Sequence, residues 1–100
     1  MKKMLCHTPT PGKAPTKIDL DKYRQVAEAI LNVLPDEGDG LAFTDLPDLV
    51  ADYLGESKMQ AIGSRTWYTT TVKLHLETEG KIRRVAGKGS QRLLKLVNAN

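Results

Sequence analysis

Apolar residues recur at helical spacing in the segment that follows residue 18. Two candidate capping residues, Asp19 and Asp21, precede this stripe, and an Asp can accept hydrogen bonds from the first amides of a helix. Pro35 closes the segment, because the residue before a proline is disfavoured in the α conformation. The pattern therefore predicts an amphipathic helix over residues 19–34. Its apolar face is expected to consist of Tyr23, Val26, Ala27, Ile30, Leu31 and Leu34.

Two further helices are predicted after the first, with a short connection between them. Thr44 is the expected N-cap of the earlier one and Gly55 its expected end. Residues 56–63 are expected to form the connection, and a serine then begins the helix predicted over residues 64–79. We expect this helix to continue through the three weak helix formers at 69–71, since capping and apolar spacing agree. The buried face of the earlier helix should be Leu46, Leu49, Val50, Tyr53 and Leu54.

The remaining apolar runs are short and typical of strands. Residues 41–43 predict a minor edge strand, and residues 81–85 and 91–97 predict a β-hairpin with a Gly-containing turn at 86–90. The order is then helix, short strand, helix, helix, hairpin. This order predicts an α+β fold, a winged helix-turn-helix with three helices and a C-terminal β-hairpin wing, as one domain over residues 18–97.

Charge is unevenly distributed along the chain, whose net charge is only +3. Residues 1–63 carry seven Lys and Arg against ten Asp and Glu, whereas residues 64–100 carry eight against two. A basic C-terminal third indicates an acidic partner for that region, or a solvated face. Residues 1–17 are rich in Pro, Thr and Lys without periodicity, which predicts a flexible basic N-terminal arm.

Several classes of protein are excluded by composition. One hundred residues allow one domain, and no apolar run approaches the roughly 20 residues of a membrane span, so we expect a soluble, cytoplasmic protein. A single cysteine, Cys6, excludes an internal disulfide. Cys6, His7 and His75 have no recognised zinc spacing, and His75 is expected to be a partly buried core residue. We therefore expect no metal, no cofactor and no enzymatic activity.

The helix predicted over residues 64–79 is the candidate recognition helix, because the major groove of DNA admits an α-helix. One polar face of it offers candidate DNA contacts in Arg65, Thr66, Thr70 and Lys73. The predicted wing would contact the flanking phosphates through Lys81, Arg83, Arg84, Lys88 and Arg92. Glu77 shares the helix face and is unfavourable beside phosphates.

A second surface of the same helix favours a different function. Trp67 and Leu74 fall on the side opposite Val72 and Leu76, where apolar residues are unexpected on a DNA-reading helix. Either the arm or the wing covers them, or they form an exposed apolar seam that binds a partner such as a second copy of the chain. The two function classes are thus a double-stranded DNA-binding module and a protein-interaction or dimerisation domain.

The segment 72–84, Val-Lys-Leu-His-Leu-Glu-Thr-Glu-Gly-Lys-Ile-Arg-Arg, resembles the passage from recognition helix to wing in winged-helix bacterial transcription regulators. Residues 43–46 resemble the entry of those proteins into their second helix. This resemblance implies the winged-helix fold and, more weakly, a small DNA-binding transcription regulator.

The signature Trp-x-x-x-Thr-Val-x-Leu-x-Leu-Glu-x-x-Gly, followed by Gly-Lys and Arg-Leu pairs, resembles a family of small bacterial proteins of unknown function. Here the likeness covers residues 17–96. Its positions are Trp67, Thr71, Val72, Leu74, Leu76, Glu77, Gly80, Gly87, Lys88, Arg92 and Leu93. The family implies no known activity, so it supports the fold only.

Overall fold

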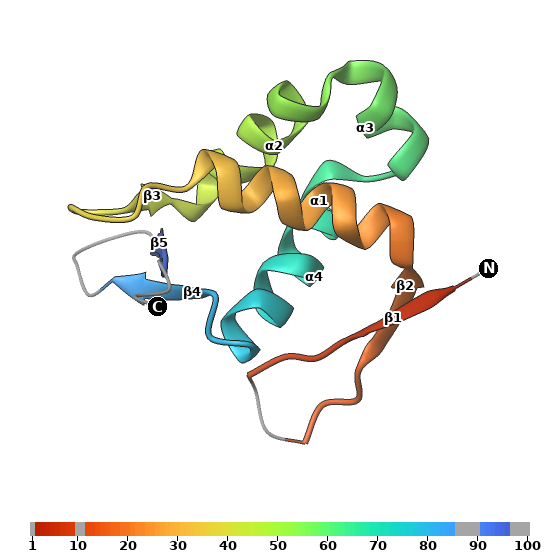
Figure 1. The fold of residues 1–100 in the computed structure, drawn as a ribbon, viewed down its shortest axis with the longest axis horizontal. Coiled ribbons are helices and arrows are strands. Elements are labelled where there is room, and N and C mark those ends of the chain that lie inside the picture. Colours follow the sequence, from red (N-terminus) through yellow and green to blue (C-terminus); the bar gives the residue numbers. More distant parts are fainter. Residues whose placement is uncertain (1, 10–11, 86–90, 97–100) are drawn as a thin grey trace.

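The computed structural model describes residues 2–9, 12–85 and 91–96, which contain four α-helices and two small antiparallel sheets (Figure 1). In chain order these are β1 (Lys3–Cys6), β2 (Thr16–Asp19), α1 (Leu20–Val33), β3 (Leu41–Ala42), a 3₁₀ turn (Phe43–Asp45), α2 (Leu46–Leu54), α3 (Glu56–Ile62), α4 (Arg65–Thr78), β4 (Ile82–Val85) and β5 (Arg92–Lys95). The predicted α+β class is confirmed, with four helices rather than three.

Helix α1 begins and ends where its local signals predict. The Asp19 carboxylate accepts hydrogen bonds from the amides of Asp21 and Lys22 at 2.9 and 3.2 Å. Leu34, the residue before Pro35, is extended and ends the helix. The buried face matches the predicted stripe through Tyr23, Val26, Ala27 and Ile30.

Helices α2 and α3 depart from the prediction. Thr44 does not cap α2; it lies inside a 3₁₀ turn, and α2 begins at Leu46 without a side-chain cap. The segment 56–63 is mostly helix α3 rather than a plain connection. Its seven residues have no side-chain cap, so the local signal is weak. The spacing of Met59 and Ile62, both buried, is the one pattern that indicates it.

Helix α4 forms as predicted, including its threonine run. The Ser64 hydroxyl accepts a hydrogen bond from the amide of Trp67 at 3.2 Å, and the helix then continues to Thr78. Thr69 is fully buried, as are Val72 and Leu76 on the same side of the helix. Packing of this face against α1 and α2 outweighs the weak helix propensity of the threonines.

The C-terminal sheet has the strand order β3–β5–β4, with both pairs antiparallel. The predicted edge strand at 41–43 is thus confirmed as β3, and the predicted hairpin strands as β4 and β5; the turn at 86–90 lies outside the described residues. Gly40 precedes β3 in a conformation with φ of 79°, and a Cβ there would lie 2.8 Å from the Leu93 carbonyl oxygen of β5. The glycine allows the loop after α1 to pass this close to the sheet.

The N-terminal residues differ from the predicted flexible arm. Strands β1 and β2 pair in antiparallel register, Met4 opposite Ile18 and Cys6 opposite Thr16. Cys6 and Ile18 are buried in the core, while the lysines that alternate with them face outward. Residues 3–6 therefore form a paired strand where a flexible arm was predicted, because Met4, Cys6 and Ile18 pack into the core near α1 and α4, while Leu5 on the other face is 44% exposed.

One core joins the helices and both sheets. Its fully buried members include Val26, Ile30, Leu46, Leu76 and Leu93, from three helices and β5. In Figure 1, α4 lies between the C-terminal sheet on one side and the N-terminal sheet on the other. None of the helices in the described ranges is both long enough and apolar enough to span a bilayer.

Candidate nucleic-acid interface

Four sides of helix α4 have different surroundings. Thr69, Val72 and Leu76 face the core. A second side contacts β4, and a third contacts β1. The side opposite the core carries the exposed stripe, which we define as Trp67, Thr70, Thr71, Leu74 and Thr78; its members are exposed or half-buried.

The side that faces β4 holds a charged cluster. The Glu77 carboxylate accepts hydrogen bonds from Arg84 Nε at 2.8 Å and from Lys73 Nζ at 3.5 Å. The side chains of Lys73 and Glu77 are only 3% and 7% exposed, and Lys73 Nζ lies 4.8 Å from the Phe43 ring centroid. Burial lowers the pKa of Lys73, which Glu77 partly offsets.

This cluster changes two expectations. Lys73 was predicted to lie on the exposed polar face and to reach DNA; it is buried, so that prediction is wrong. Its alkyl chain fills space beside Phe43 while Glu77 balances its charge. Glu77, in turn, is enclosed by two cations and no longer opposes a phosphate on the helix surface.

Arg65, at the start of α4, is engaged by acidic residues of α2 and α3. Its guanidinium donates to Asp48 at 2.9 Å and to Glu56 at 2.8 Å. The hydrogen bond to Asp48 is the main cause of a raised pKa for Arg65. Two carboxylates around one cation leave little net attraction for a phosphate, so the predicted DNA contact of Arg65 is weakened.

The cations of the predicted wing differ in their freedom. Arg83, on β4, is exposed. Lys81 is also exposed, and its Nζ lies 3.6 Å from Glu79 Oε1. Arg84 is exposed at one edge but bonded to Glu77. Arg92 is half-buried and donates to the Gly40 carbonyl at 3.0 Å. Lys88 lies outside the described residues.

The polar and apolar candidates of α4 lie side by side on the helix surface. Thr66 is exposed and Thr70 half-buried, as a surface contact requires. Trp67 is 47% exposed, with its ring edge-on to Tyr68 at 4.8 Å between centroids. Leu74 is half-buried in the exposed stripe. Among the described residues of the stripe there is no cation, so only hydroxyl and apolar groups are presented there.

His75 lies on the side of α4 that faces β1, and it is more deeply buried than the predicted partly buried position. Its Nδ1 accepts a hydrogen bond from the His7 amide at 3.0 Å, so the neutral ring carries its proton on Nε2. Nε2 lies 3.4 Å from Glu79 Oε1, in ion-pair range but outside hydrogen-bond geometry. The Tyr23 ring meets His75 edge-on at 5.6 Å.

Burial is the largest cause of the pKa shifts of His75, Cys6 and Tyr23. It lowers the pKa of His75 and raises that of Cys6 to about 11 and that of Tyr23 to about 12, with Glu79 as a further cause for the last two. All three groups are therefore neutral at physiological pH. Within the described ranges no three His, Cys, Asp or Glu side chains are arranged to hold a metal ion.

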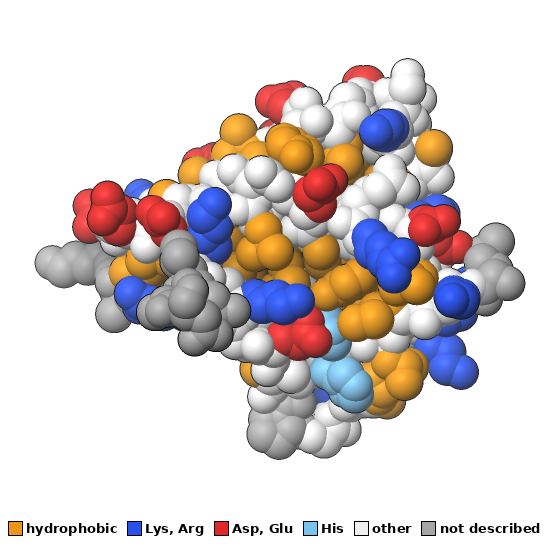
Figure 2. All heavy atoms as spheres, in the orientation of Figure 1, with side chains coloured by type: hydrophobic (Ala, Val, Ile, Leu, Met, Phe, Trp, Pro, Cys, Tyr) orange, Lys and Arg blue, Asp and Glu red, His pale blue; other side chains and the backbone are white. Residues whose placement is uncertain are grey.

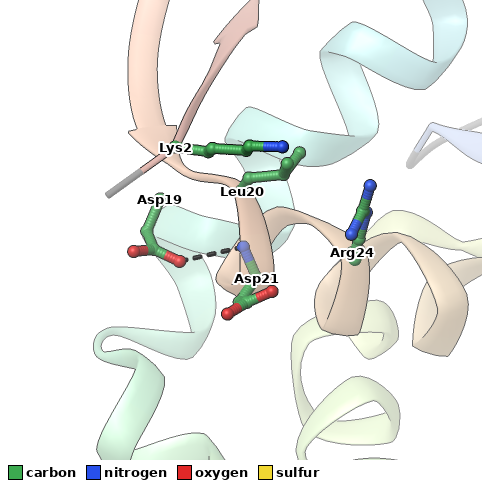
Figure 3. A pocket seen from close by; sticks show the side chains of 5 residues that line it. All are labelled: Lys2, Asp19, Leu20, Asp21 and Arg24. Carbon is green, nitrogen blue, oxygen red and sulfur yellow. Dashed lines mark hydrogen bonds between the residues drawn. The ribbon is translucent and has the colours of Figure 1, made fainter.

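A small hollow of about 200 Å³ lies where β2 meets α1. It is lined by Lys2, Asp19, Leu20, Asp21 and Arg24, and Figure 3 shows Asp19 turned toward the Asp21 amide. Two cations and two carboxylates line it, so it does not select a ligand of one charge. The sequence prediction did not include it, since its residues meet only when β1 pairs with β2.

Comparison with known proteins gives a family without an assigned activity. No curated protein and no solved structure matches this chain. The family model described as "Family of unknown function (DUF6958)" matches residues 3–93, nearly the whole chain. The match covers the four described helices and the described strands up to the second residue of β5. The chain belongs to this family of unknown function.

Proposed function

We propose that this chain is a winged-helix module that binds double-stranded DNA, of the kind used by small transcription regulators, with α4 as recognition helix and β4–β5 as wing. The observation that carries the proposal is the strand order β3–β5–β4 of the C-terminal sheet, in a chain where β3 follows α1 and the hairpin strands β4 and β5 follow α2 and α4. A strand between the first two helices that pairs with the last strand of a hairpin is the arrangement expected of a winged helix, and α3 is then an insertion before the recognition helix.

The surface around α4 indicates how the module would bind. Arg83 and Lys81 are exposed beside the helix and supply charge for phosphates. Thr66, Thr70 and the apolar groups of the exposed stripe suit thymine methyls and phosphate oxygens. The ion pair between Glu77 and Arg84 offsets the negative charge that would otherwise repel DNA phosphates from this side of α4. Because α4 presents no free cation of its own there, backbone contacts should dominate over base reading.

Titration of mixed-sequence duplex DNA tests this proposal. Anisotropy of labelled DNA and Trp67 fluorescence would be followed at low and near-physiological salt. We expect binding that weakens steeply with salt, because counterions are released from the phosphates. The variant Arg83→Gln should lower the magnitude of the salt slope by about one unit.

Lys58→Gln is the matched control. Lys58 is an exposed cation on α3, at the other end of the molecule from β4 in Figure 1, so its loss should leave the salt slope unchanged. The absence of duplex binding at low salt would refute the DNA proposal. If Arg83→Gln and Lys58→Gln lower the magnitude of the salt slope equally, net charge rather than the wing drives binding.

A second candidate function rests on Trp67. A tryptophan that is 47% exposed beside half-buried Leu74 suits pairing of two copies across the exposed stripe. Sedimentation equilibrium without DNA distinguishes this function: a dimer that Trp67→Ala converts to monomer supports it, and a monomeric wild-type protein contradicts it. Arg83→Gln should leave the mass unchanged in either case.

A further inference from the structure

We propose that the outward face of the β1–β2 sheet is a second phosphate-binding surface, which contacts DNA on the opposite side of α4 from β4. This inference rests on the proposed function, and it assigns a nucleic-acid contact to a part of the chain distant in sequence from the helix and the wing.

The first step is the position of the sheet relative to α4. His7, just after β1, is hydrogen-bonded to His75, whereas Glu77 is bonded to Arg84 of β4. Residues two apart on an α-helix point about 200° away from each other, because each residue turns the helix by about 100°. Sheet β1–β2 and strand β4 therefore flank α4 on opposite sides, as Figure 1 also shows, with the exposed stripe between them.

The second step is the direction of the side chains in the sheet. The register places Leu5 opposite Lys17 and Lys3 opposite Asp19. Side chains alternate across a strand, and with Cys6 and Ile18 buried, Lys3 and Lys17 are directed outward. Both lysines are exposed.

The third step is the charge of this face. Lys3 and Lys17 project from the outward face, beside the 44% exposed Leu5. Two further exposed lysines lie near the sheet: Lys13 in the connection between its strands, and Lys2, which lines the hollow beside α1. In the described part of the chain none of them is in an ion pair with a carboxylate. Asp19, the nearest acid by register, is engaged by two amides of α1. Figure 2 shows Lys and Arg side chains gathered over this sheet and the start of α1.

The fourth step is rigidity. Cys6 and Ile18 anchor the sheet in the core, and the Leu20 amide donates to the Lys2 carbonyl at 3.0 Å. Cations held on a fixed sheet bind phosphates with a smaller loss of conformational entropy than cations on a loose tail. Two basic elements flanking one helix match the charge of DNA backbone on both sides of a groove.

The test compares two charge-removing variants in the duplex titration. Lys3→Gln/Lys17→Gln removes two outward cations from the sheet, Arg83→Gln removes one from β4, and Lys58→Gln is the control. We expect the double variant to lower the magnitude of the salt slope by roughly two units and to weaken binding about tenfold at low salt. Slow alkylation of the buried Cys6 thiol, equal to that of the wild-type protein, verifies that the sheet remains docked.

The outcomes separate the inference from the function it rests on. If the wild-type protein binds duplex and Arg83→Gln lowers the slope while the double variant equals Lys58→Gln, the proposed function stands and this inference is overturned. In that case the lysines serve only to discourage pairing with other strands. If the wild-type protein does not bind duplex at any salt concentration, the proposed function fails first.

Discussion

At the scale of single residues, Gly38 and Gly40 form a natural pair for comparison. Both lie in the loop after α1 with positive φ, 89° and 79°. A Cβ on Gly38 would meet nothing within 4 Å, whereas one on Gly40 would meet the backbone of Leu93 at 2.8 Å. The surroundings therefore differ although the backbone conformations are alike.

Substitution by alanine should reveal this difference. Gly38→Ala should cost about 1 kcal/mol of unfolding free energy, the strain of a left-handed residue with a side chain. Gly40→Ala should cost about 3 kcal/mol, because the loop must also move away from β5. Urea denaturation measures both, and equal losses would mean that the close approach to Leu93 has no energetic effect.

At the scale of elements, the cluster of Lys73, Glu77 and Arg84 joins α4 to β4. Two of its three side chains are almost completely buried, in contrast to the pair of Arg65 and Glu56 on the surface. Loss of one partner from a buried pair leaves an unbalanced charge, whereas a surface pair is screened by water and salt.

Glu77→Gln should therefore destabilise the protein by about 3 kcal/mol, since it leaves the Lys73 ammonium buried without its carboxylate. Adding Lys73→Met should recover part of the loss. Glu56→Gln is the control and should cost less than about 1 kcal/mol. Thermal and urea unfolding measure all three variants; a double variant less stable than Glu77→Gln would contradict the assigned role of the cluster.

At the scale of the whole molecule, His75 couples the N-terminal sheet to the helical core. Burial is the main cause of the lowered pKa of His75; Glu79 raises this pKa, whereas His7 and Lys81 lower it further. The nearby Tyr23 and Cys6 side chains are neutral. The folded state then binds a proton at His75 less readily than the unfolded state does. The stability contributed here is complete above the ordinary pKa of 6.5 and is lost as the pH falls below it.

Protonation would also turn Nδ1 into a donor and remove the hydrogen bond from the His7 amide. We expect the stability advantage of the wild-type protein over His75→Phe to shrink between pH 7 and pH 5 in urea denaturation. His7→Gln keeps the donating amide but removes a group that lowers the pKa of His75, so the pH dependence should persist with a smaller amplitude than in the wild-type protein. A constant advantage at both pH values would exclude His75 as the titrating group.

Prediction from the sequence succeeded where the determining signal is local. The Asp19 and Ser64 caps lie within three residues of the amides they bind, and Pro35 acts on its immediate neighbour. The strands β3, β4 and β5 follow from short apolar runs. Helix α3 was missed because its only pattern is one spacing, between Met59 and Ile62.

The candidate interface was predicted less well. Helical periodicity places Lys73 beside Thr66 and Thr70, but it does not say that Phe43 and Arg84 enclose that side of α4. The free or engaged state of Arg65 likewise depends on Asp48 and Glu56, from other helices. Exposure of a cation is a property of its neighbours in space.

By itself, the sequence determined the α+β class, the ends of α1 and α4 and the strands of the C-terminal sheet, because caps, prolines and apolar periodicity act over a few residues. It left open whether Trp67 is covered or exposed, which the tertiary structure decided. The tertiary structure alone decided that the N-terminal lysines are held in a sheet, that His7 meets His75 across 68 positions, and that Lys73 is buried. These features arise from contacts between elements far apart in the chain, which local patterns do not specify.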